Sequence, residues 1–143
     1  MAAFSALLIL SGYQEAQLTQ PLMSNELKQD FETATIKHLL FKSKLRSFLH
    51  GSNTNEAPIR DPEVCLLGQW IRNHGLPVYG QLRETQELDR QHRLVHQVAN
   101  RLMDLKLAGH PEEALAGFAE IEVVSEKIVL LLQTMQQKLR NGA

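Results

Sequence analysis

The sequence predicts an all-α protein, an antiparallel helical bundle of the four-helix type. Apolar residues recur at spacings of three and four through three long segments, which is the pattern of amphipathic helices. No stretch alternates apolar and polar residues as a half-buried strand would. Proline and glycine separate the periodic segments, at the positions where helices begin and end. At 143 residues the chain can bury one core without disulfides.

Charge and cysteine content exclude several kinds of protein. Lys and Arg number 15 against 16 Asp and Glu, without a long run of one sign, so nothing favours a nucleic-acid surface or an anionic membrane. The single cysteine fits a reducing compartment. Residues 1–10 are apolar, but they are too few to span a bilayer and lack the basic start of a signal peptide. We expect a cytoplasmic protein with no membrane insertion, a partly apolar N-terminal extension at 1–23, and a bundle domain at 24–143.

The first long helix is expected to run from about Ser24 to about Leu49. Pro21 should close the segment before it, and Ser24 or Asn25 can cap its first turn. Gly51 follows its end and opens a polar connection. Its apolar seam is formed by Leu27, Phe31, Ala34, His38, Phe41, Leu45 and Phe48.

A short helix that carries the only cysteine is expected next, between the first and the third helices. Asp61 can cap it, Pro62 suits its first turn, and Gly75 ends it. The segment contains Cys65 and Trp70.

The third helix should begin between Val78 and Leu82 and end at Gly109, and the last should begin at Pro111. One stripe of the third helix holds Leu82, Thr85, Asp89, His92, His96, Ala99 and Met103. The seam of the last helix holds Ala114, Phe118, Ile121, Ser125, Ile128, Leu132, Met135 and Leu139. Apolar residues also lie off this seam at 129–131, and surplus apolar surface on a small helical domain favours a homodimer.

Three histidines occupy seam positions where the pattern calls for apolar residues, namely His38, His92 and His96. Buried imidazoles are costly unless their nitrogens have partners. With Cys65 they make a complete tetrahedral ligand set for zinc, with no position left open for a substrate. The alternative at this point is a core in which ordinary hydrogen bonds satisfy the rings.

Other site chemistries fit poorly. A di-iron bundle needs several inward carboxylates, and Asp89 is the only acid on the histidine stripe. Asp89 is instead a candidate hydrogen-bond acceptor for a ligand imidazole, although a solvated acid at the bundle edge is an equal alternative. A Cys–His–Asp triad lacks an activating loop and a glycine-lined oxyanion site. We therefore expect no enzyme.

Four motifs together resemble the bacterial chemoreceptor zinc-binding (CZB) domain family. They are HLLFK at 38–42, DPEVCLLGQW at 61–70, LPVY at 76–79 and HRLVH at 92–96. The resemblance covers about residues 25–140, and Phe41 stands where the family commonly has tryptophan. It implies a dimeric helical bundle in which His38, Cys65, His92 and His96 bind zinc, while Gly68 and Trp70 pack the short helix against the core.

The resemblance also implies a regulatory role in signal transduction. The Cys65–zinc bond would respond to zinc availability or to oxidants such as hypochlorous acid, and the bundle would then signal to a protein partner that carries the output function. No output domain is recognisable in this sequence, and its initial Met favours a free-standing domain. The alternatives are a zinc-stabilised adaptor module without a sensing role and, from the enzyme class, a small metallohydrolase or oxygen-binding bundle.

Overall fold

The computed structural model describes the backbone of residues 2–142 and the side chains of residues 25–142. This part of the chain is helical and contains no strand, which confirms the predicted fold class. Three helices are long: α1 (Ala2–Leu49), α5 (Arg83–Leu107) and α7 (Phe118–Arg140). The short elements are α2 (Ala57–Arg60), α3 (Leu66–Trp70), the π-helix η1 (Ile71–Gly75), α4 (Leu76–Tyr79) and α6 (Pro111–Ala116).

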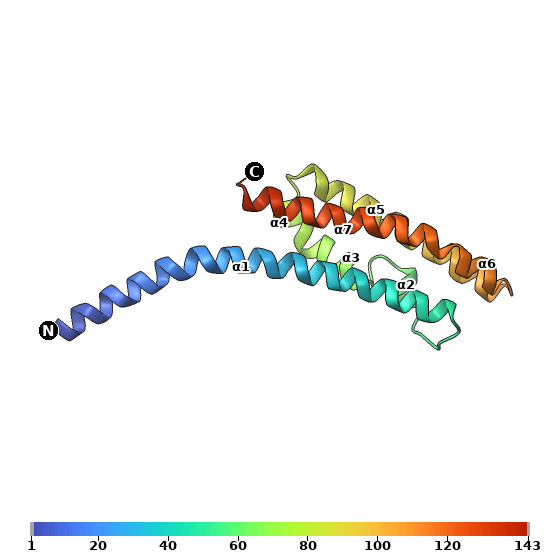
Figure 1. Cartoon of the computed structure of the whole chain (residues 1–143), viewed down its shortest axis with the longest axis horizontal. Helices are drawn as coiled ribbons and strands as arrows, with labels where there is room; N and C mark the ends of the chain where they lie inside the picture. The colour runs from blue at the N-terminus through green and yellow to red at the C-terminus, as the bar shows by residue number, and fades with distance from the viewer. Residues whose placement is uncertain (1, 143) are drawn as a thin grey trace.

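The three long helices pack side by side, and the short elements between α1 and α5 fill the fourth position of the bundle (Figure 1). Residues 61–79, which hold α3, η1 and α4, bring the chain back along α1 and are called the return segment below. As a result α1 and α5 point in the same direction, and α7 runs opposite to both (Figure 1). No helix among the described residues is both long and apolar enough to cross a membrane.

The predicted seams form the core. On α1 every seam residue from Phe31 to Phe48 is buried, and on α7 the seam residues from Ile121 to Met135 are buried. Each seam places its apolar side chains on one helical face, which removes them from water. Lys42 and Arg46 of α1 add ion pairs to Glu122 of α7, with nitrogen–oxygen distances of 2.7 and 3.0 Å.

The predicted start of the first helix at Ser24 or Asn25 is wrong, because α1 continues through Pro21 from Ala2. A proline inside a helix removes one backbone hydrogen bond and bends the helix, but it need not end the helix when good helix formers flank it. The far end of α1 agrees with the prediction. Gly51 follows it with a φ of +98°, a conformation that glycine adopts without strain.

The return segment is more broken than the single short helix that we expected. Residues 62–64 form a turn and α3 begins only at Leu66, so Cys65 precedes the helix instead of lying within it. Pro77 lies in the first turn of α4, where its missing N–H costs nothing. The last helix is likewise divided at Gly117 into α6 and α7. In both places proline or glycine interrupts the backbone pattern, and packing then decides where the helix resumes.

Candidate metal centre

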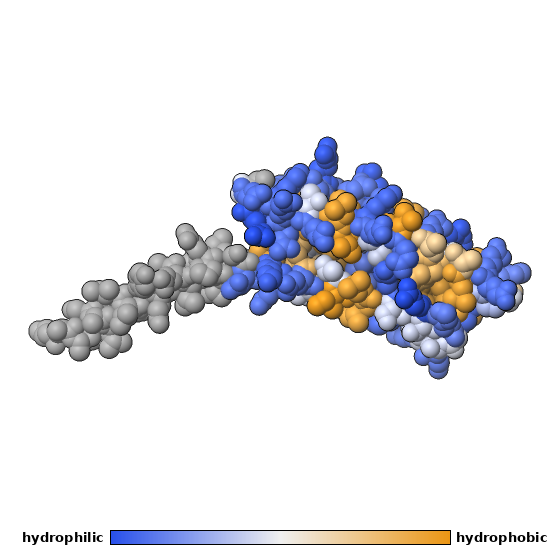
Figure 2. Space-filling view, in the orientation of Figure 1, coloured by the Kyte–Doolittle hydropathy of each residue, from blue (hydrophilic) through white to orange (hydrophobic). Residues whose placement is uncertain are grey.

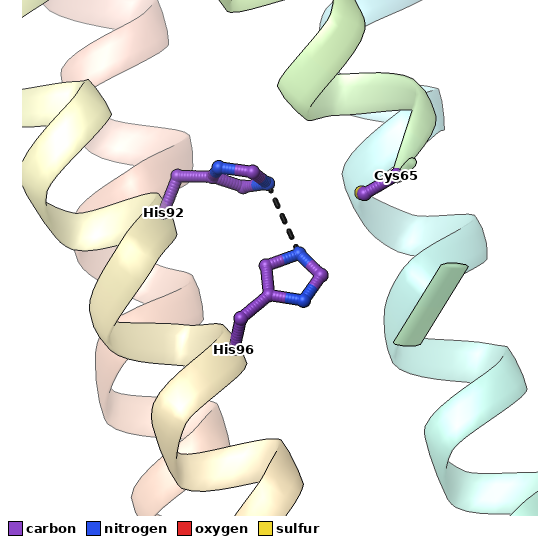
Figure 3. Close-up of side chains that lie close together, drawn as sticks. All are labelled: Cys65, His92 and His96. Carbon is purple, nitrogen blue, oxygen red and sulfur yellow. Dashed lines mark hydrogen bonds between the residues drawn. The ribbon is translucent and has the colours of Figure 1, made fainter. Parts of the chain in front are cut away.

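Three of the four predicted ligands come together in the core. The donor atoms of Cys65, His92 and His96 all lie within 4.8 Å of one another, and the three residues are buried. Figure 3 shows the two imidazoles of α5 beside Cys65 of the return segment. The chain thus brings a thiol to one point with two imidazoles that follow it by 27 and 31 residues.

The two histidines face each other because they are four residues apart on α5, one helical turn along the same face. Their Nε2 atoms are 3.1 Å apart (Figure 3). Two imidazole nitrogens that share a tetrahedral zinc ion at 2.0–2.1 Å lie about 3.3 Å apart. The pair is therefore already close to the spacing that zinc requires.

A backbone carbonyl fixes the orientation of His96. Its Nδ1 lies 2.7 Å from the carbonyl oxygen of Ile59, which can only accept a hydrogen bond. Nδ1 must therefore carry the proton, and Nε2 presents its lone pair toward His92 and Cys65. Metal-binding histidines commonly make such a hydrogen bond through their other nitrogen.

Cys65 lies in a tightly folded part of the return segment that also packs on α5. A Cβ placed on Gly68 would be 1.6 Å from the carbonyl oxygen of Pro62 and 2.9 Å from Cε1 of His92. Only glycine fits such an approach. Trp70 packs edge-to-face on Phe31 of α1, with ring centroids 5.8 Å apart, and holds the other face of the segment against the core.

His38, the fourth predicted ligand, is fully buried on α1 but lies outside the group that the other three form. Its Nε2 is 2.7 Å from Oγ of Ser125 on α7, and its Nδ1 has no hydrogen-bond partner. The ring stacks on Phe41, which also contacts the ring of His96 at a centroid distance of 4.6 Å. His38 is therefore a neighbour of the cluster, held on the side of α7.

Burial keeps all three imidazoles neutral. Desolvation lowers the pKa of His38 and of His96 to about 4 and that of His92 to about 3. Nearby positive charge lowers the pKa of His38 and His92 further. Burial also raises the pKa of the Cys65 thiol. Neutral imidazoles offer lone pairs to a metal ion, whereas this thiol needs a cation beside it to lose its proton.

Asp89 lies beside Arg93 at the edge of the site. Its Oδ2 pairs with Nε of Arg93 at 3.3 Å, and its side chain is 25% exposed. Asp89, His92 and Gly68 line the same hollow of about 130 Å³ between α5 and the return segment. The predicted role of Asp89 as an acceptor for a ligand imidazole stays a prediction.

The residues present fit a zinc ion. One thiol and two or three imidazoles are ligands of intermediate softness, which zinc prefers over the oxygen-rich sites of magnesium or calcium. His38, a neighbour of the cluster, also has a buried Nδ1 atom without a hydrogen-bond partner. The donor set and the spacing of the α5 histidines therefore agree with a structural type of zinc site.

Sequence reasoning missed two partners of the histidines. The carbonyl of Ile59 could not be found, because a backbone acceptor leaves no mark in a sequence. Ser125 could have been found, since it is a polar residue in the apolar seam of α7 and is only 3% exposed.

Comparison with known protein families matches residues 38–103 to the chemoreceptor zinc-binding domain. The matched segment contains His38, Cys65, His92 and His96, together with the whole return segment. Neither the curated proteins nor the solved structures gave a significant match.

Proposed function

We propose, on the premise that residues 38–103 belong to the chemoreceptor zinc-binding domain family, that this protein is a regulatory sensor whose single zinc ion is held by Cys65, His92, His96 and His38. Zinc is the ligand of this family, and the family is regulatory, not catalytic. One observation carries the proposal: a buried thiol and two buried imidazoles lie within 4.8 Å of one another. A single metal ion would give all three buried side chains a shared partner.

Each residue has a distinct part in holding the ion. His96 offers Nε2 because Ile59 holds its Nδ1 proton. His92 would also offer Nε2 and move its proton to Nδ1, where Asp89, one turn earlier on α5, is an available acceptor. Cys65 supplies the only anionic ligand, so the ion would bind the return segment most strongly through it.

The sensing step follows from the position of Cys65. Zinc, when bound, keeps the sulfur as a thiolate, the form that oxidants attack. Reaction of that thiolate with hypochlorous acid gives a sulfenic acid and a chloride ion, and it replaces the anionic ligand by a neutral one. The return segment would then lose its main attachment to α5. Loss of zinc has the same consequence, so one site can report either signal.

The signal would leave the domain through a partner and through a dimer. Large apolar side chains are exposed on the face that α1 and α7 share, where Figure 2 shows apolar areas among polar ones. They are Ile36 and Leu39 of α1 and Val123 and Leu130 of α7, and Leu39 and Leu130 line one groove between the two helices. This surface favours a homodimer built on α1 and α7. The proposed location is the cytoplasm, and a protein partner would carry the output.

The second candidate function is a zinc-stabilised adaptor module. It would use the same ion to hold the bundle together and would bind its partner in the same way whatever the state of Cys65. The complete burial of the cluster favours this alternative, since structural zinc sites are closed.

The first experiment measures zinc content and the reactivity of the thiol. Cys65 is the only cysteine, so a thiol reagent reports on it alone. We expect about one zinc per chain after purification without added metal, and a thiol that reacts only after chelation. A Cys65→Ser variant should lose most of its zinc affinity. Protein without zinc, or zinc-loaded protein with a freely reactive thiol, would contradict the four-ligand site.

A second experiment separates the sensor from the adaptor. Zinc-loaded protein is treated with hypochlorous acid, and zinc release is followed together with dimer mass and hydrogen exchange in residues 61–79. The sensor predicts that all three change together. Oxidation that releases zinc but leaves the mass and the exchange unchanged would favour the adaptor.

A further inference from the structure

Ser125 of α7 makes an unusual contact for a serine in a helix. Its Oγ lies 2.7 Å from Nε2 of His38, a residue 87 positions away in sequence, and both side chains are buried. The other seam residues around it, Ile121, Ile128 and Leu132, are apolar and fully buried. A hydroxyl in such a seam costs free energy unless it is hydrogen bonded.

Two other hydroxyls of the long helices are satisfied within their own helix. Thr35 and Thr134 donate to the carbonyls of the residues four positions earlier, Phe31 and Leu130. This is the usual solution for serine and threonine within a helix. Ser125 instead contacts an imidazole on another helix, so its position in the seam is explained by His38 and not by its own helix.

The contact leaves one nitrogen of His38 free. Nδ1 is buried and has no hydrogen-bond partner. If Nδ1 carried the proton, it would be a buried donor without an acceptor. This tautomer costs more free energy than the one with the proton on Nε2. With the proton on Nε2, that nitrogen donates to Oγ of Ser125, and Nδ1 keeps a lone pair that only a cation or a proton would use.

We propose that Ser125 is a positioning residue of the metal centre: it accepts a hydrogen bond from Nε2 of His38 and so presents Nδ1 as the ligand atom. This inference rests on the proposed zinc site and adds a residue from α7, a helix that lies outside the segment matched to the family. His92 and His96 face each other through Nε2, so His38 would differ from them in the atom it uses.

The same contact makes α7 part of the response. His38 must approach the other three donors to bind with them, because it lies outside their group. Ser125 ties that movement to α7, and the ion pairs of Lys42 and Arg46 with Glu122 lie on the same two helices. A ligand role for His38 would therefore connect the metal centre to both α1 and α7.

The test compares zinc affinities, measured by competition with a chromophoric chelator, of the wild type and Ser125→Ala. We expect the alanine variant to bind about 10-fold more weakly, the lower end of the effect of losing an outer hydrogen bond to a metal ligand. Ser125→Thr keeps the hydroxyl and should retain most of the affinity. Thr134→Ala, which loses only a local hydrogen bond on the same helix, should bind as the wild type does.

Imidazole nitrogen NMR of the zinc-loaded wild type gives an independent readout. We expect the proton of His38 on Nε2 and the metal on Nδ1, and His96 with the opposite assignment. Metal on Nε2 of His38 overturns the inference even if the alanine variant fails to fold. The inference is also overturned if Ser125→Ala folds and binds zinc as well as the wild type does. Tighter binding overturns it too, because it would mean that Ser125 competes with the metal for His38. A wild type that binds no zinc overturns the proposed function and this inference together.

Discussion

Gly68 is the residue at which the candidate centre leaves least space. Its α-carbon lies against the backbone of Pro62 and the ring of His92, so a methyl group there meets a carbonyl oxygen that cannot move independently. The separation of Cys65 from the α5 histidines depends on this approach.

Gly68→Ala should therefore weaken both folding and zinc binding. We expect a loss of about 1–3 kcal/mol in the free energy of unfolding, the usual cost of overpacking, measured by denaturant titration. Zinc affinity should fall by at least 10-fold as the return segment moves away from α5.

Gly109→Ala is the matched control. Its added methyl group meets no atom within 4 Å, but its φ of +91° is strained for alanine. It should lose about 1 kcal/mol of stability and keep its zinc affinity. Equal zinc affinities of the two variants would show that the close approach at Gly68 does not set the geometry of the site.

At the scale of elements, the far end of the return segment is held by a cluster outside the metal centre. Nε2 of His74 lies 2.5 Å from Oδ2 of Asp30, and the hydroxyl of Tyr79 donates to the same oxygen at 2.6 Å. Desolvation and this hydrogen bond raise the pKa of Tyr79, so its hydroxyl keeps its proton and continues to donate.

Asp30→Asn should loosen this end of the return segment. The amide is a weaker acceptor than the carboxylate, and a bond to a charged group contributes about 1.5–3 kcal/mol. Local opening of residues 71–79 should then cost less free energy, and their backbone amides should exchange faster in a hydrogen-exchange measurement.

Glu32→Gln, on the same helix, removes only an exposed ion pair with Lys28 and should leave that exchange unchanged. If Asp30→Asn exchanges at the wild-type rate, the Asp30 contacts do not hold the segment.

The sequence predicted the long helices well because their seams repeat over many turns, and His92 and His96 follow from the same period. The interior of residues 61–79 could not be predicted, since a five-residue π-helix and two helical turns depend on the packing of Trp70 and Gly68. The contact of His38 with Ser125 depends on how two helices far apart in sequence are rotated against each other. Periodicity indicates which face is buried, but it does not indicate which buried residues meet.

For the whole molecule, the buried histidines link stability to pH when zinc is absent. Their folded pKa values of about 3 to 4 lie below the ordinary 6.5, so between these limits the unfolded chain binds more protons than the folded chain. The free energy of unfolding of zinc-free protein should therefore fall as the pH is lowered from about 6.5 toward 4.

The measurement is the urea midpoint of chelator-treated protein at pH 7 and pH 5, with a lower midpoint expected at pH 5. His92→Gln removes one of the three imidazoles and should show a smaller decrease between these two values. A midpoint that rises on acidification would contradict the burial of neutral rings.

The exposed apolar face predicts the state of association. Leu130 of α7 is 62% exposed on this face. Leu130→Glu should weaken the expected dimer by at least 10-fold without loss of helix content, measured by sedimentation at several concentrations.

Leu107→Glu is the matched control, because Leu107 is 61% exposed at the end of α5. It should leave the dimer intact. A monomeric wild type, or equal association of the two variants, would remove the α1 and α7 face as the interface.

The Asp30 contacts have a further consequence for how fast the site recovers. When the bond to Cys65 is lost, residues 61–79 remain attached to α1 through His74 and Tyr79, only nine and fourteen positions beyond the cysteine. A short tether of this kind keeps a group at an effective local concentration in the millimolar range. Recapture of the thiol is then an intramolecular event. The supply of metal and reductant, and not the refolding of residues 61–79, would set the time that the protein needs to return to its zinc-bound state.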